Sequence, residues 1–87
     1  MKVSVITAVR NGARDIGATL ASVESQDYSD IEHVVVDGAS TDGTAEIVRR
    51  EGRRVARLLS EPDRGAYDAF NKGLALATGD VVGYLNA

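Results

Sequence analysis

The 87-residue sequence contains no cysteine and only one histidine, His33. The absence of cysteine excludes disulfide bonds, thiolate catalysis and Cys-ligated zinc, and a single histidine excludes a metal site built from several histidines. No apolar run approaches the roughly 18 residues that span a membrane. The apolar start, residues 1–9, is interrupted by Ser4 and Thr7 and lacks a small-residue cleavage site, which argues against a signal peptide. We therefore expect a cytoplasmic protein, attached at most to the cytosolic face of a membrane.

The charge balance is also short of positive residues, and the net charge is −3. A general nucleic-acid-binding protein normally has a basic balance, so we expect no nucleic-acid partner. Hydrophobic residues make up 44% of the chain and charged residues 26%, which is ordinary for one small globular domain. The core of such a short domain is expected to be marginal.

Short β-branched runs alternate along the chain with stretches of helical periodicity. The runs predict strands at residues 2–8, 31–38, 55–60 and 80–87. The periodic stretches predict helices that begin near Ile16 and that cover residues 45–52 and 66–79. Repeated strand–helix–strand units favour parallel pairing with helices on both faces. The predicted fold class is α/β: a three-layer, doubly wound, mainly parallel sheet of four strands alternating with three helices.

For some of these elements the sequence also predicts which residues are buried. The strand at residues 31–38 is almost continuously apolar, as expected when both faces of a sheet are covered. Residues 81–85 are likewise predicted to form a buried strand. On the third helix, we expect a single apolar stripe, made of Ala66, Phe70, Leu74 and Ala77.

Hydrogen-bonding and charged residues follow the strands on one side of the predicted sheet. Residues 7–12 end the first strand, residues 37–43 end the second, residues 61–65 end the third, and Asn86 ends the fourth. In sheets of this class, ligands bind outside the carboxyl ends of the strands. The sequence therefore predicts a ligand site along this carboxyl edge.

Asp37 is the most informative residue of that edge, and two roles are open to it. Its carboxylate can accept hydrogen bonds from the N–H groups of a base or from ribose hydroxyls. Alternatively, it forms an Asx-turn into the next helix, with Ser40 or Thr41 as the N-cap. The two roles are compatible.

Other motifs are weaker or absent. The stretch that starts at Asp37 fails the EF-hand pattern, and neither a P-loop nor G-x-G-x-x-G is present. Arg64 is suited to a diphosphate, although a local pair with Asp63 on a surface turn explains the dipeptide as well. The arginine-rich run at residues 49–57 is interpreted as a solvated face, with contact to anionic lipid as the alternative. His33 is interpreted as structural.

Taken in order, two stretches resemble a known family: "SVITAVRNGARDIGATLASVESQDYSDIEHVVVDGASTDGT" and "SEPDRGAYDAFNKGLALATGDVVGYLNA". The chain resembles, from Lys2 to Ala87, the N-terminal half of a family 2 inverting glycosyltransferase. The resemblance implies a GT-A fold and an enzyme that transfers a sugar with inversion. The donor would be a nucleotide-diphosphate sugar (a UDP- or GDP-sugar), and the acceptor a glycan or a lipid-linked molecule.

The resemblance also implies a set of residues that bind the nucleotide-sugar. It implies no catalytic residue within this chain. The set is Thr7, Ala8, Val9, Asn11, Asp37, Ser40, Asp63, Arg64, Asn71 and Asn86. In the family, an acidic pair that holds Mg²⁺ or Mn²⁺ comes immediately after the position of Ala87. Two residues depart from the family pattern: Gly38 replaces a second acidic residue, and Arg10 replaces an aromatic one.

We therefore expect residues 1–87 to form a single N-terminal nucleotide-sugar-binding domain that ends just before the metal-binding pair and is inactive alone. The alternative is a non-catalytic nucleotide-binding or oligomerisation module of the same fold. Its fourth strand would be an open edge, which invites self-association. A phospho-acceptor signalling domain is rejected, because it needs an acidic pair where this chain has Ala8, Val9 and Arg10.

Overall fold

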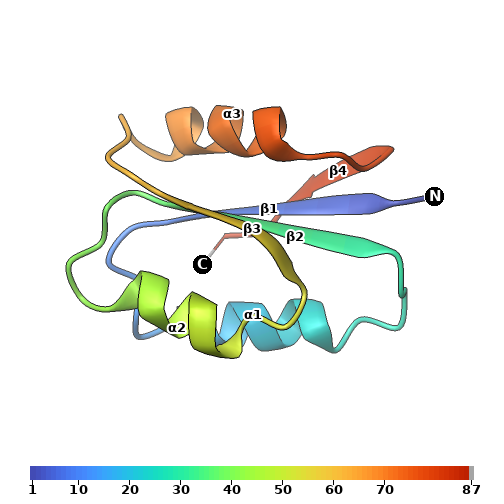
Figure 1. Cartoon of the computed structure of the whole chain (residues 1–87), viewed down its shortest axis with the longest axis horizontal. Coiled ribbons are helices and arrows are strands. Elements are labelled where there is room, and N and C mark those ends of the chain that lie inside the picture. The colour runs from blue at the N-terminus through green and yellow to red at the C-terminus, as the bar shows by residue number, and fades with distance from the viewer. Residues whose placement is uncertain (87) are drawn as a thin grey trace.

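A computed structural model describes residues 1–86 and contains four strands and three helices in alternation. In chain order these are β1 Val3–Val9, α1 Ile16–Glu24, β2 Ile31–Asp37, α2 Thr44–Glu51, β3 Val55–Ser60, α3 Ala66–Leu76 and β4 Val81–Tyr84. The strands are all parallel and lie in the order β3-β2-β1-β4. Helices α1 and α2 cover one face of the sheet and α3 covers the other (Figure 1). The predicted three-layer α/β class is confirmed, with a sheet that is parallel throughout.

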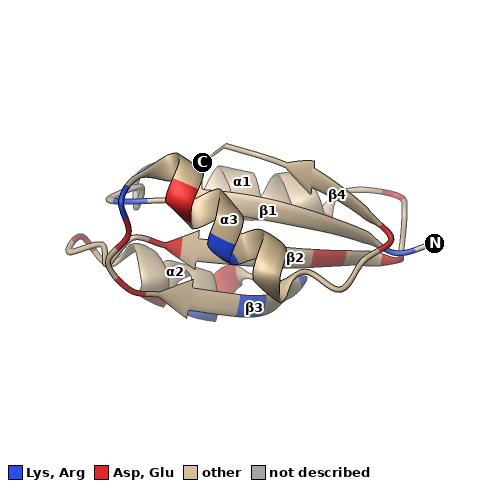
Figure 2. Ribbon diagram, turned by 90° about the horizontal axis from the view of Figure 1, so that it is seen from above, with Lys and Arg blue, Asp and Glu red and all other residues tan. Residues whose placement is uncertain are grey.

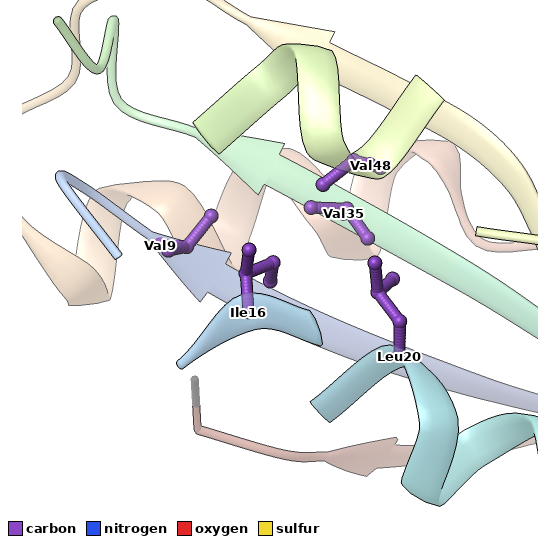
Figure 3. Packing of buried hydrophobic residues seen from close by; sticks show 5 residues of the cluster. All are labelled: Val9, Ile16, Leu20, Val35 and Val48. Carbon is purple, nitrogen blue, oxygen red and sulfur yellow. The ribbon is translucent and has the colours of Figure 1, made fainter. Parts of the chain in front are cut away.

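The core consists of two apolar clusters, one on each face of the sheet. The cluster under α1 and α2 (Figure 3) contains Val9, Ile16, Leu20, Val35 and Val48. The cluster under α3 contains Ile6, Val34, Val36 and Ala69. Strand β2 contributes to both, as its continuous apolar run predicts. Each fully buried Val, Leu or Ile side chain stabilises the fold by roughly 1.5–3 kcal/mol.

The predicted stripe on α3 is confirmed for Phe70 and Ala77, which pack against the second apolar cluster, and is wrong for Ala66 and Leu74. Ala69 and Gly73 are the buried residues of α3, whereas Ala66 and Leu74 are exposed. The reason is a close approach to β1, because a Cβ at Gly73 would lie only 2.5 Å from Cγ2 of Ile6. Small residues let the helix settle on the sheet, so they take the buried face that the larger Leu74 was expected to occupy.

Strand β4 is also less buried than predicted. It pairs with β1 alone and forms one edge of the sheet. Val81, Val82 and Tyr84 remain 45%, 40% and 41% exposed. An apolar run indicates a strand but not its place in the sheet, and an edge strand has fewer neighbours to cover it. On the face towards α1, a groove lies beside β4, lined by residues that include Val3, Val5, Tyr28, Gly83 and Leu85.

No helix within residues 1–86 combines the length and the apolar character needed to cross a membrane.

Candidate functional site

The loops that follow β1 and β2 are held together by hydrogen bonds at the carboxyl edge of the sheet. The backbone N–H of Asn11 donates to Oγ of Ser40 (2.7 Å), and the N–H of Thr41 donates to Oδ1 of Asn11 (2.9 Å). Asn11 and Ala39 both have left-handed backbone conformations, with φ of 51° and 58°. Asparagine tolerates this conformation better than alanine. Two of the predicted site residues, Asn11 and Ser40, thus bind one another's loops.

A second set of hydrogen bonds joins the loop after β1 to the start of α2. Oδ2 of Asp42 accepts from the N–H of Ala13 (3.1 Å), and Oδ1 of Asp42 accepts from the N–H of Thr44 (3.1 Å) and from its hydroxyl. The Thr44 hydroxyl in turn accepts from the N–H of Gly12 (3.0 Å). The hydrogen bond from the Thr44 hydroxyl is the main cause that lowers the pKa of Asp42. Because Gly43 precedes the helix at the N-cap position, the prediction of Ser40 or Thr41 as the N-cap is wrong.

Asp37 ends β2 and is fully buried. Its carboxylate accepts hydrogen bonds from the N–H of Ser40 (3.1 Å), from the Ser40 hydroxyl and from the Ser60 hydroxyl (2.7 Å). Of the two roles open to Asp37, the structure contains the local turn. Through Ser60, the carboxylate also ties β2 to the end of β3.

Thr7 lies beneath this edge rather than on it. Its hydroxyl is 2.8 Å from Nε2 of His33, and both side chains are buried. Burial lowers the pKa of His33 from 6.5 to about 4, although Glu24 acts in the opposite direction. His33 is therefore a core residue, in agreement with its structural interpretation, and the Thr7 side chain is its partner.

A pocket of about 120 Å³ opens where β1 ends beneath the start of α3. It is lined by Ala8, Val9, Arg10, Asp63, Gly65, Ala66 and Ala69. In the strand order β3-β2-β1-β4, the chain runs outward from β1 to β3 and then returns to the other side of β1. This reversal makes the end of β1 the topological switch point, where sheets of this class bind ligands. Three predicted residues, Ala8, Val9 and Asp63, meet there.

The β3–α3 loop beside the pocket is anchored to α3. The N–H of Arg64 donates to Oδ2 of Asp68 (2.9 Å), and Nζ of Lys72 donates to the carbonyl of Pro62 (2.9 Å) and pairs with Glu61 (3.3 Å). No ion pair between Asp63 and Arg64 occurs in the described part of the chain, so the local pair considered as an explanation of that dipeptide is not found. The Arg64 side chain is exposed at the carboxyl edge.

Asn71 and Asn86 are not brought into the pocket. Both are exposed, Asn71 on α3 and Asn86 after the end of β4. Among the described residues, no hydrogen bond joins either side chain to the other predicted site residues.

Sequence reasoning missed an aromatic patch between α3 and β4. Phe70 and Tyr84 pack edge to face with ring centroids 5.2 Å apart, and Tyr67 is 82% exposed beside them. These are three of the four aromatic residues of the chain. The spacing of Tyr67 and Phe70 on one helix was visible in the sequence, but their meeting with Tyr84 depends on the sheet order.

The arginine-rich run is largely engaged by its own chain. Arg54 donates to the carbonyls of Tyr28 (2.9 Å) and Gln26 (3.1 Å), and Arg50 pairs with Glu51 (2.8 Å). Positive and negative residues are interspersed over the ribbon (Figure 2). These contacts favour the interpretation of this run as a solvated face.

A metal site is not formed by the part of the chain that the structure describes. Residues 1–86 contain no group of three or more His, Asp or Glu side chains placed to hold a metal ion. These residues therefore do not by themselves provide the Mg²⁺ or Mn²⁺ site that the resemblance implies for the family.

Comparison with known proteins identifies the class to which this fold and edge belong. The family model described as glycosyl transferase family 2 matches residues 4–87. The chain belongs to glycosyltransferase family 2, and its sheet matches the GT-A type glycosyltransferases of known structure.

Three relatives illustrate the match. A protein of Nostoc sp. named an uncharacterized glycosyltransferase is 38% identical over 90 residues, which cover 100% of this chain and 28% of that protein. A mannosyltransferase from Pyrobaculum calidifontis, solved with GDP-Man and Mn²⁺, is 41% identical with a TM-score of 0.85, over 93% of this chain and 26% of that one. Glucosyl-3-phosphoglycerate synthase from Mycobacterium tuberculosis, solved with Mn²⁺, UDP and glucosyl-3-phosphoglycerate, is 26% identical with a TM-score of 0.81, over 98% and 33%. The chain thus spans a third or less of each relative.

Proposed function

We propose that this chain is the nucleotide-sugar-binding part of an inverting glycosyltransferase. The observation that carries the proposal is the pocket at the switch point, lined by Ala8, Val9, Arg10 and Asp63, in a chain of family 2. Two relatives that contain this fold were solved with GDP-Man or with UDP, each together with Mn²⁺. The donor of this protein is accordingly a UDP- or GDP-sugar, and the acceptor is a glycan or a lipid-linked molecule.

The chain's own residues bind and orient the donor in this proposal. The end of β1 and the start of α3 supply the pocket. The joined loops fix the backbone around it, so that little ordering is needed when the nucleotide binds. Arg10 and Arg64 offer planar guanidinium groups suited to a diphosphate. Asn71 and Asn86 lie outside the pocket and are kept in the proposed nucleotide-sugar-binding set on the resemblance alone. Asp37, Asn11 and Ser40 hold the loops in place, and Thr7 lies beneath them.

The chemical step needs groups beyond residues 1–87. A divalent cation, Mg²⁺ or Mn²⁺, neutralises charge on the leaving diphosphate when it is bound. A carboxylate base takes the proton of the attacking acceptor hydroxyl. The ligands of the cation and the base are both proposed to lie in residues that follow Ala87 in a longer protein. The 87 residues alone are proposed to be inactive. Location in the cytoplasm or at the cytosolic face of a membrane is part of the same proposal and is checked by cell fractionation.

Sequencing the coding DNA beyond the codon for Ala87 tests the domain assignment most cheaply. An open reading frame that starts with an acidic pair supports the enzyme. A stop codon contradicts it and favours the non-catalytic module. For a longer protein, NMR of the anomeric configuration of the product then tests inversion.

The alternative module has one specific observation in its favour. The exposed residues of β4 leave one edge of the sheet open, and such edges pair readily with another chain. Self-association through β4 is therefore proposed for the isolated 87 residues in either case.

A further inference from the structure

Four carboxylates lie at the carboxyl ends of β2 and β3, and three of them are bound to other residues. Asp37 is buried among the two serine side chains described above. Asp42 is bound to the β1–α1 loop and to Thr44. Glu61 pairs with Lys72 at 3.3 Å. None of these three lines the pocket.

Asp63 is the fourth carboxylate, and it does line the pocket. Its Oδ1 accepts a hydrogen bond from the N–H of Gly65 (2.9 Å), which fixes the side chain in a local turn. Its Oδ2 accepts no hydrogen bond from the described residues. Asp63 is half-buried and is fixed through one oxygen, while its other oxygen lies beside Gly38 and accepts no bond from the described residues.

The position of Asp63 depends on the residue opposite. A Cβ placed on Gly38 would lie 2.9 Å from Oδ2 of Asp63 and 3.3 Å from its Cγ. Real Cβ atoms are essentially never closer than 3.0 Å to such neighbours. A side chain at position 38 would therefore require the Asp63 carboxylate to shift from its present place.

We propose that Asp63, and not Asp37, is the carboxylate that recognises the nucleoside, and that Gly38 makes this possible by leaving room for it. The inference rests on the proposed nucleotide-binding function. A carboxylate recognises N–H and O–H donors, which the nucleoside presents as the N–H groups of uracil or guanine and as the ribose hydroxyls. Arg10 lines the same pocket and is then available to the diphosphate. Asp37 is a positioning residue, because its oxygens are already used.

Titration calorimetry of the chain with UDP and GDP tests the role of Asp63. Asp63→Asn keeps an oxygen acceptor for the N–H of Gly65, so the turn is retained while the charge is lost. A charge-assisted hydrogen bond is about twice as strong as a neutral one, so binding is expected to weaken about tenfold or more. Glu61→Gln is the matched control, because it removes a charge from the same loop outside the pocket, and its affinity should equal that of the wild type.

The outcomes separate this inference from the proposed function. If the wild type binds and Asp63→Asn binds equally well, the assignment of Asp63 is overturned while the nucleotide-binding proposal stands. If the wild type binds neither nucleotide, the proposed function is overturned and the inference with it. Thermal unfolding of each variant checks that a weaker affinity is not a loss of fold.

The role of Gly38 is tested by moving the carboxylate. Gly38→Asp places a second acid against Asp63 and is expected to weaken nucleotide binding about tenfold or more through repulsion and displacement. Combining it with Asp63→Asn leaves one carboxylate at this place and should recover most of the lost affinity. Gly38→Ala tests the space alone if Gly38→Asp does not fold. Wild-type affinity in whichever single variant is folded would overturn the role of Gly38.

Discussion

At the scale of single residues, His33 is a buried titratable group whose partner is the Thr7 hydroxyl rather than a carboxylate. Its pKa is lowered by burial to about 4 in the folded chain, against about 6.5 in an unfolded one. Between these values the unfolded state binds a proton that the folded state does not. The free energy of unfolding is therefore highest, as far as His33 is concerned, above pH 6.5. It falls as the pH drops towards 4, by as much as about 3 kcal/mol.

Urea unfolding at pH 7 and at pH 4.5 measures this loss. His33→Gln cannot take up the proton, so it should lose much less stability than the wild type over the same interval. Glu32 and Asp42, whose carboxyl pKa values are lowered, leave a residual loss in both proteins at the acid end. Equal losses in the wild type and in His33→Gln would show that His33 does not carry the pH dependence.

Asp37 gives a second prediction at this scale. Asp37→Asn replaces one acceptor oxygen with an NH₂ group, which faces the hydroxyls and N–H that now donate to the carboxylate. The fold is expected to lose about 1–3 kcal/mol, because buried donors are left without an acceptor. Ser60→Ala, which removes a single donor, should cost less. Urea unfolding at pH 7 distinguishes the two, and an Asp37→Asn variant as stable as the wild type would contradict the buried network.

At the scale of elements, the close packing of α3 against β1 depends on Gly73. Gly73→Ala improves the helix propensity by roughly 1 kcal/mol but places a methyl group 2.5 Å from Cγ2 of Ile6. Overpacking of this kind costs about 1–3 kcal/mol, so net destabilisation is expected. Gly83→Ala is the matched control, because no atom lies within 4 Å of the added Cβ, and its stability should change by about 0.5 kcal/mol or less. Chemical unfolding of both variants provides the comparison.

The elements themselves could be predicted because each leaves a local signal. The valine run of β2 indicated a strand covered on both faces, and β3 was predicted with the bounds that it has, Val55–Ser60. The predictions that failed were those that depend on contacts between elements. The sequence does not show that Gly73 meets Ile6, so Leu74 was wrongly assigned to the buried face of α3. Nor does it show that β4 lies at an edge, so its exposure was missed.

The candidate site shows the same division. The rule that ligands bind at the carboxyl ends of strands pointed to the edge where Val9, Asp37 and Asp63 lie, and ligand binding there stays a prediction. The pairing of Asp37 with Ser60 joins residues 23 apart in the sequence, and the contact of Asp63 with Gly38 joins two separate loops. Such contacts decide which carboxylate is buried and which faces the pocket, and they depend on the folded sheet.

At the scale of the whole molecule, the open edge at β4 predicts self-association of the isolated chain. Val81, Val82 and Tyr84 are exposed on a strand with a free edge, which favours pairing with a second copy. Sedimentation velocity over a range of concentrations should show a dimer or larger species, and Val82→Lys should shift the equilibrium towards the monomer. A wild-type chain that stays monomeric at every concentration would contradict this prediction.

The central claim is that the nucleotide binds at the carboxyl edge of the sheet, at the end of β1. The most direct measurement is a ¹H–¹⁵N NMR titration of the chain with UDP and GDP. At least one nucleotide is expected to shift the amide signals of Val9, Arg10, Gly38 and residues 63–66. The signals at the opposite edge of the sheet, where the strands begin, around Glu32 and Gly79, should stay unchanged. Shifts confined to that opposite edge, or none with either nucleotide, would contradict this claim.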